Sequence, residues 1–274
     1  MRQPLNRGTP IDQQRYDRWM AQFSGYHDPV TNSILEMWLR QFRKVDRDLA
    51  ARILDSVLFI PAQAVKASFL DGLNSLEGWS TNASQRRGRW FFVPYSGSVG
   101  ESGDSMLHLF RIAASLTQKK YADLFIHRSE IVEKKLGPDD TVVLIDDFSG
   151  TGKQVCDYWN DIFQELLSGG SRVFILLVAA TAQALTRIEN ETEIMPICTR
   201  ILDDGYNVFH STCSHFSPGE KQTILHYCHR ADQITPKGFG DAGLLVVLSH
   251  QCPNDSIPIL HTVSRAWRGL FPRH

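Results

Sequence analysis

The sequence lacks any long apolar run. Its most apolar stretch, residues 172–179, falls well short of the roughly 18 consecutive apolar residues that a membrane-spanning helix needs. The first residues also lack the apolar centre of an export signal. We therefore expect a cytoplasmic protein that neither crosses a membrane nor is exported.

Cysteine is scarce, and its spacing follows no pattern. The five cysteines are scattered, and no two of them form a C-x-x-C pair. This excludes the small disulfide-rich secreted class and favours a reducing compartment. Cys156 would fall in the first turn of an expected helix, where a thiol pKa can be lowered, but core packing is the simpler interpretation.

A gathering of histidine and cysteine between residues 210 and 229 invites a zinc interpretation. His226 and His229 would share one face of a helix and could hold one ion together. Cys213 and His215, however, do not have the spacing of a zinc half-site. We expect exposed or hydrogen-bonded side chains there.

The sequence has no excess of positive or negative charge. The chain has 29 Lys and Arg residues against 30 Asp and Glu residues, which excludes the strong positive field of a general nucleic-acid binder. Basic residues outnumber acidic ones in the first 90 positions, and the reverse holds in the remainder. This distribution indicates that the N-terminal part meets an anionic partner.

One stretch carries the clearest chemistry. Residues 141–145 form an apolar, β-branched run that is typical of a buried parallel strand. Asp146 and Asp147 follow, then Phe148, the run Ser-Gly-Thr-Gly, and apolar residues at helical spacing from Lys153 onward. This order predicts an anion site, because glycines expose backbone N–H groups and a helix N-terminus favours negative charge.

The two aspartates narrow the choice of ligand. They would repel a bare phosphate unless they faced sugar hydroxyls or a cation, so a phosphorylated sugar fits better than inorganic phosphate. Adjacent carboxylates also repel each other, which favours a binding role over a capping role at the strand end. The expected cation is Mg²⁺, held mainly by the substrate, and no firm protein ligand for a metal is predicted.

A rival motif, the nucleotide-binding loop G-x-x-x-x-G-K-[ST], shares its second half with Gly152-Lys153. Asp147 stands where that motif requires its first glycine, and Gln154 stands where it requires a hydroxyl for Mg²⁺. The rival motif therefore does not fit.

Residues 143–153, Val-Leu-Ile-Asp-Asp-Phe-Ser-Gly-Thr-Gly-Lys, resemble the signature of type I phosphoribosyltransferases. The resemblance implies that Asp146 and Asp147 hold the ribose hydroxyls of phosphoribosyl pyrophosphate. It also implies a loop for the 5′-phosphate, made of Ser149, Gly150, Thr151, Gly152 and Lys153. Two positions depart from the pattern. Gly150 replaces an aspartate of purine-salvage members, and Gln154 replaces a usual Thr or Ser.

Segments 91–98, 252–260 and 270–273 extend this likeness to most of the chain. Together with the acidic stretch they resemble phosphoribosyltransferase-like proteins of bacterial conflict systems, of the PRTase-CE type, including retron-associated ones. The resemblance implies an effector of anti-phage defence that transfers or hydrolyses the glycosyl group of phosphoribosyl pyrophosphate or a nucleotide. It also implies a regulatory partner, either a protein or a protein–nucleic-acid assembly such as a reverse transcriptase with its DNA or RNA.

A catalytically silent module is the alternative function. Such a protein would use the same site to sense a phosphorylated ribose or to hold a partner. Gly150 favours this alternative because it removes a candidate general base, whereas the intact acidic pair favours an enzyme.

A second loop of small polar residues, 96–105, follows the strand expected at 89–95. Ligands of open α/β sheets lie beyond the carboxyl ends of strands, and the family places its pyrophosphate loop after the first core strand. The candidate residues are Ser96, Gly97, Ser98, Ser102 and Gly103. The alternative is a surface loop without a ligand, since Gly and Ser also dominate such loops.

Alternation of strands and helices predicts an α/β domain over residues 80–274, with an open, mainly parallel sheet of the type I phosphoribosyltransferase kind. Further strands are expected at 172–179, 193–202, 243–249 and 257–261, and weaker ones at 121–126 and 130–133.

Residues 1–79 are predicted as a separate helical region, because several amphipathic segments precede a linker-like stretch at 78–88. Residues 62–76 could be the reading helix of a winged helix, but their single basic residue, Lys66, favours a helical cap on the core. Trp19, Tyr26 and Trp38 are candidates for exposed aromatic side chains that would contact a partner.

Overall fold

The computed structural model describes residues 11–95 and 103–273. The chain forms two compact units, Gln63–Asp203 and the combination of Met1–Ala62 with Asp204–His274. We call the first the sheet unit and the second the terminal unit. This division differs from the predicted boundary after residue 79, because the C-terminal segment shares a hydrophobic core with the N-terminal helices.

The sheet unit is built on a parallel sheet in the order β2-β3-β4-β5. These strands are β2 (Trp90–Pro94), β3 (Thr141–Ser149), β4 (Arg172–Thr181) and β5 (Met195–Cys198), and β6 (Ile201–Leu202) also pairs with β4. Nearly every residue of β3 and β4 is buried, as their continuous apolar runs predicted.

The strand order of the sheet reverses beside β2. On its outer edge, Phe92 forms a parallel bridge with Phe125, and Ile126 N–H donates to the Phe92 carbonyl at 3.2 Å. On its inner edge, Tyr95 N–H donates to the Ile145 carbonyl at 3.0 Å. The chain thus leaves β2 on one side and returns as β3 on the other, which places a topological switch point at the carboxyl ends of these two strands.

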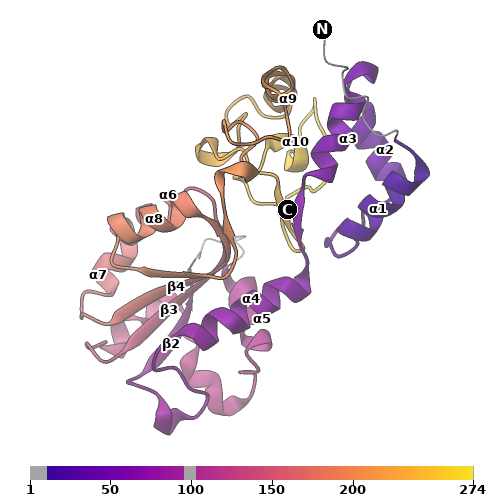
Figure 1. Cartoon of the computed structure of the whole chain (residues 1–274). Helices are drawn as coiled ribbons and strands as arrows, with labels where there is room; N and C mark the ends of the chain where they lie inside the picture. Colours follow the sequence, from indigo (N-terminus) through magenta and orange to yellow (C-terminus); the bar gives the residue numbers. More distant parts are fainter. Residues whose placement is uncertain (1–10, 96–102, 274) are drawn as a thin grey trace. The chain divides into compact units, whose positions relative to one another are not determined.

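Helices cover both faces of this sheet (Figure 1). One face carries α4 (Ala62–Ser75) and α5 (Gly103–Ala113), and the other carries α6 (Lys153–Tyr158) and α8 (Ala182–Glu191). A Cβ on Gly72 would lie 2.2 Å from Leu176 Cδ1, so α4 packs directly onto β4. Because α4 belongs to the sheet unit and the helices before it belong to the terminal unit, they do not form one three-helix module, and the winged-helix alternative is wrong.

The remaining elements of the sheet unit are short. A five-residue π-helical turn (Trp159–Phe163) and α7 (Gln164–Leu166) continue α6, and 3-10 turns span 83–85, 119–124, 128–130 and 132–134. The weak strands predicted at 121–126 and 130–133 do not form, although Phe125 makes one isolated parallel bridge with Phe92. Tight turns satisfy most of the backbone of these stretches locally, while Leu124, Ile126 and Ile131 are still buried.

The terminal unit combines helices from both ends of the chain. They are α1 (Gln13–Phe23), α2 (Asn32–Arg40), α3 (Arg47–Asp55), α9 (Pro218–Ala231) and α10 (Pro258–His261), with 3-10 turns at 44–46, 204–206 and 239–241. The strands β1 (Leu58–Ile60) and β7 (Val246–Leu248) pair in parallel.

Two local sequence patterns in this unit had different outcomes. The run Ser217-Pro218-Gly219-Glu220 has the pattern of a capping box, and Ser217 and Glu220 form one at the start of α9. The strand predicted at 257–261 is wrong, because Pro258 begins the short helix α10 instead. Proline suits the first turn of a helix and cannot donate to a sheet.

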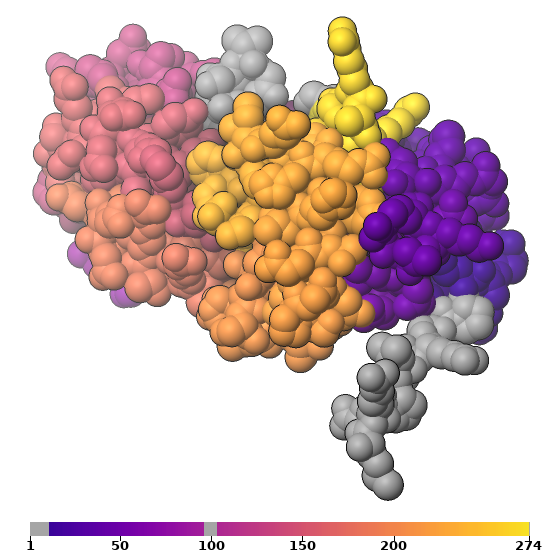
Figure 2. Space-filling view, turned by 90° about the horizontal axis from the view of Figure 1, so that it is seen from above, coloured from indigo at the N-terminus to yellow at the C-terminus, as the bar shows by residue number. Residues whose placement is uncertain are grey.

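Aromatic side chains form the core of the terminal unit. Trp19, Tyr26 and Trp38 are only 1%, 4% and 1% exposed to solvent, so the prediction that their side chains are exposed is wrong. Phe271 packs edge-on against Phe23 and Tyr26, with ring centroids 4.9 and 5.1 Å apart. Figure 2 shows the yellow C-terminal residues against the indigo N-terminal helices.

Within the described residues, no helix is both long enough and apolar enough to cross a membrane.

Candidate functional site

The acidic pair lies inside β3, close to its carboxyl end. Sequence patterning ended this strand at Ile145, but pairing with the long strand β4 continues through Phe148 and Ser149. Asp146 is 7% exposed, and Asp147 is half-buried. The N–H of Asp147 donates to Asp146 Oδ1 at 3.0 Å, which orients that carboxylate against its own backbone.

Strand geometry separates the two carboxylates. Successive side chains of a strand leave on opposite faces, so Asp146 belongs to the face covered by α6 and α8, and Asp147 to the face covered by α4 and α5. Their mutual repulsion is therefore weaker than the sequence argument assumed. The pKa of the buried Tyr95 is raised, first by burial and then by the negative charge of Asp146.

Thr181 holds the loop that follows the acidic pair. Its hydroxyl donates to the Gly150 carbonyl at 2.6 Å and accepts the N–H of Ala184 at 3.0 Å as the N-cap of α8. Thr181 was not among the site residues predicted from the sequence. The available signal was a threonine between an apolar strand and a helical pattern, which is a usual N-cap arrangement.

Gly152 makes the turn into α6. Its φ is +70°, and a Cβ there would lie 2.8 Å from the Ala184 carbonyl oxygen. Glycine is required on both counts, because L side chains avoid this backbone conformation and no space exists for one. The Gly152 carbonyl then accepts the N–H of Cys156 at 3.0 Å, which starts the helix.

Tyr95, which follows β2, ties the loop to the neighbouring strand. Its buried hydroxyl lies 2.9 Å from the carbonyl oxygens of both Gln154 and Val155 in the first turn of α6. This contact is a second positioning element that sequence analysis missed. Together, Thr181 and Tyr95 fix the loop on its two sides.

Lys153 extends along α6. Its ammonium lies 2.5 Å from Asp157 Oδ2, and both side chains are about half exposed. Its backbone N–H lies 3.4 Å from the Thr151 hydroxyl oxygen. Burial raises the pKa of Cys156 on the same helix, so that thiol is not activated.

The candidate pyrophosphate loop is described only at its end. Ser96, Gly97, Ser98 and Ser102 lie outside the described residues, whereas Gly103 is buried and begins α5. Their assignment stays a prediction.

In the described part of the chain, no group of three or more His, Cys, Asp and Glu side chains could hold a metal ion. Cys228, between the two histidines of α9, is fully buried, and burial raises its pKa.

Comparison with known proteins gives one result that covers most of the chain. No curated protein matches the sequence. The family model PRTase-CE matches residues 35–273, a range that includes β3, its acidic pair, the following loop and the C-terminal segment of the terminal unit. The chain therefore belongs to the PRTase-CE family and is a phosphoribosyltransferase-like protein.

Proposed function

We propose that the protein binds phosphoribosyl pyrophosphate, or a nucleotide with the same 5-phosphoribosyl group, at the carboxyl end of β3. The supporting observation is the order of groups there. Asp146 and Asp147 are followed at once by a loop that Thr181 and Gly152 hold in place. This arrangement lies at the switch point of the sheet, where ligands of α/β proteins bind.

Each part of the site has a role in this proposal. The carboxylates of Asp146 and Asp147 accept hydrogen bonds from the ribose hydroxyls, because ionised carboxylates are strong acceptors. The backbone N–H groups of residues 149–153 donate to the 5′-phosphate. The side chain of Lys153 acts less directly, since its ammonium already pairs with Asp157.

The chemistry of this site suits Mg²⁺. Two carboxylates beside a phosphate loop are hard oxygen donors, and Mg²⁺ prefers phosphate oxygens and water with few protein ligands. When bound, the ion would neutralise charge on a leaving pyrophosphate. Asp146 and Asp147 are the residues that would hold it, directly or through water.

The proposed reaction breaks the bond between ribose C1 and the leaving pyrophosphate or base. The sugar then has oxocarbenium character until an acceptor or water adds at C1, as in other glycosyl chemistry. Positioning and charge stabilisation would supply most of the rate enhancement. The loop at 96–105 is the candidate for contacting the leaving group.

A silent sensing module is the second candidate, and one observation favours it. Gly150 provides no side chain that could act as a base, and its carbonyl is engaged by Thr181. A protein of this kind would bind the ligand with Mg²⁺ and turn over none of it.

Titration calorimetry tests the binding proposal. Phosphoribosyl pyrophosphate, ribose 5-phosphate and inorganic pyrophosphate are compared with and without Mg²⁺. We expect phosphoribosyl pyrophosphate to bind with a Kd between about 1 μM and 1 mM, the usual range for enzyme substrates, and more weakly without Mg²⁺. Absence of binding at millimolar ligand by folded protein would refute the proposal. Phosphorus NMR of the protein with phosphoribosyl pyrophosphate, or with a nucleotide, separates the two candidates, because only an enzyme that hydrolyses the C1 bond forms ribose 5-phosphate.

We further propose that the protein is a defence effector restrained by a partner, as the likeness to conflict-system proteins suggested. Expression in bacteria with and without neighbouring genes tests this, with phage plating as the readout. We expect growth arrest from the protein alone and relief by the partner. Harmless expression and unchanged phage plating in both settings would contradict it.

A further inference from the structure

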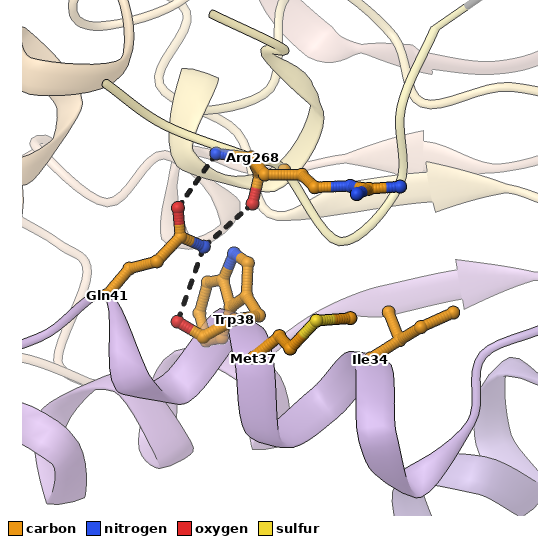
Figure 3. Close-up of a pocket in the computed structure, with 6 residues that line it drawn as sticks. Ile34, Met37, Trp38, Gln41 and Arg268 are labelled. Atoms are coloured by element: carbon orange, nitrogen blue, oxygen red, sulfur yellow. Dashed lines mark hydrogen bonds between the residues drawn. The ribbon is translucent and has the colours of Figure 1, made fainter. Parts of the chain in front are cut away.

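A small pocket opens on the terminal unit between α2 and the C-terminal segment (Figure 3). It encloses about 230 Å³. Its lining consists of Ile34, Met37, Trp38, Gln41, Arg268 and Gly269. We call it the α2 pocket.

The walls of the α2 pocket are fixed by hydrogen bonds. The Gln41 carboxamide donates to the Arg268 carbonyl and accepts the Arg268 N–H, both at 2.8 Å, as a neighbouring strand would (Figure 3). The Trp38 indole N–H donates to the Ile259 carbonyl at 2.8 Å. The pocket is therefore preformed, so little ordering free energy is lost when something enters it.

The α2 pocket has the size of an anchor site. Drug-sized ligands and cofactors occupy pockets of roughly 300–1,000 Å³, and this one is smaller. Its volume suits a single large apolar side chain. Met37, which lines the pocket, is 48% exposed. Val263 is 63% exposed and forms an antiparallel bridge with Arg268, another lining residue. Exposed Met and Arg beside a preformed pocket are typical of protein interfaces.

Positive charge lies at the α2 pocket. Arg268 lines the pocket, Arg265 is exposed three residues before it, and neither has an ion pair among the described residues. Arg230 also lacks a carboxylate partner in that part of the chain. Its guanidinium lies 3.4 Å from the Gln41 carbonyl and over the Trp267 ring. The acidic residue of α2, Glu36, already pairs with Arg40 at 2.8 Å.

We propose that the α2 pocket docks a partner protein that inserts one apolar side chain flanked by Asp or Glu. The pocket supplies a site for the apolar group, and guanidiniums that lack a carboxylate partner among the described residues supply charge complementarity for carboxylates beside that group. A nucleic acid would use the arginines but leave the apolar floor unfilled, so a protein segment fits better. This inference does not depend on the ligand bound at β3.

Peptide selection on the whole protein provides the test. Phage-displayed random 12-residue peptides are selected, and the enriched sequences are made as fluorescein-labelled synthetic peptides for anisotropy titration. We expect an aromatic or aliphatic residue with acidic neighbours. Met37→Glu and Arg268→Glu are each expected to weaken binding at least tenfold. Met195→Glu, on β5 of the sheet unit and 42% exposed in the wild type, is the matched control and should leave affinity unchanged.

Arg268→Glu should leave the fold intact, because Gln41 bonds to the backbone of Arg268 and not to its side chain. Circular dichroism before titration identifies any variant that fails to fold. The proposal is overturned if no peptide is enriched, if the peptides lack acidic residues, or if both pocket variants bind as the wild type does. It is also overturned if sedimentation shows self-association that Met37→Glu abolishes, since the occupant is then a second copy. Salt-dependent oligonucleotide binding lost in Arg268→Glu would likewise assign the surface to nucleic acid.

Discussion

Strand β3 has an Asp-Asp pair near each end, and the two pairs differ in what surrounds them. At the amino end, Asp140 accepts the Arg89 backbone N–H, two guanidinium N–H groups of Arg89 and the N–H of Gly137, at distances from 2.6 to 3.2 Å. The Arg89 hydrogen bond holds the pKa of Asp140 below its ordinary value. That carboxylate closes the turn before the strand.

The pair at the carboxyl end, Asp146 and Asp147, leads into a glycine loop at the switch point of the sheet. The same dipeptide therefore stands in two different structural settings. In a parallel sheet the carboxyl ends of the strands face the ligand crevice, whereas the amino ends meet the turns that close the fold. The comparison predicts that changes at the amino end affect stability and changes at the carboxyl end affect binding.

The largest expected effect is at the carboxyl end. Replacing both residues, Asp146→Asn with Asp147→Asn, should weaken binding of phosphoribosyl pyrophosphate with Mg²⁺ at least a hundredfold, because amides offer neither charge nor two acceptor oxygens. The free energy of unfolding should stay within about 0.5 kcal/mol of wild type or rise, because an amide oxygen still accepts the N–H at position 147 and the repulsion between adjacent charges is removed. Calorimetry and urea unfolding measure the two quantities.

The control for this change is Asp139→Asn, which alters the exposed member of the other pair. It should leave both ligand binding and stability unchanged. If the Asp146 and Asp147 double variant binds as tightly as wild type, the carboxyl-end pair is structural and the comparison fails.

Asp140→Asn should show the opposite pattern. The amide loses the charge that Arg89 faces and turns a hydrogen-bond donor toward the donors of Arg89 and Gly137. We expect a loss of about 2–3 kcal/mol in unfolding free energy, the magnitude of hydrogen bonds to charged groups. Urea unfolding followed by tryptophan fluorescence measures it. If Asp140→Asn had wild-type stability but bound the ligand more weakly, the amino end of β3 would have the binding role and the prediction would be wrong.

Gly152→Ala sharpens the comparison at the loop. Both the backbone strain at φ +70° and the contact with the Ala184 carbonyl oppose a Cβ. We expect about 1–3 kcal/mol of lost stability and weaker ligand binding. Gly170→Ala is the matched control, because its φ is +76° but nothing lies within 4 Å of the added Cβ. Equal losses in the two variants would show that the contact at Gly152 contributes nothing.

The smallest effect concerns pH. Because the pKa of Asp140 is lower in the folded protein than its ordinary value of 3.8, the unfolded chain binds more protons in this range, and stability rises with pH. The contribution of Asp140 to the free energy of unfolding is fully present above the pKa that Asp140 has in the unfolded chain. It disappears as pH falls through the lower pKa that Asp140 has in the folded protein. This contribution changes by at most about 1.4 kcal/mol per pH unit. The stability difference between wild type and Asp140→Asn should therefore shrink below about pH 4 in urea titrations. A constant difference down to pH 2.5 would contradict this.

Local signals in the sequence predicted the central strands of the sheet unit and one helix start of the terminal unit. Residues 141–145 and 172–179 are strands because their apolar runs suit burial on both faces, and Ser217 with Glu220 begins α9 as its capping pattern indicated. The acidic pair and its glycine loop were found for the same reason, since strand, loop and helix are contiguous in the chain. The extension of β3 to Ser149 was not predictable locally, because pairing with β4 decides it.

The sequence by itself determined the family, the parallel sheet and the acidic stretch, since each depends on residues that are neighbours in the chain. Only the tertiary structure decided that Phe271 completes the core of the N-terminal helices, that Thr181 and Tyr95 fix the loop, and that Gln41 meets Arg268. These contacts join residues between 31 and 248 positions apart. Hydrophobic burial is non-directional, so a pattern shows which side chains are buried but not which distant segment covers them.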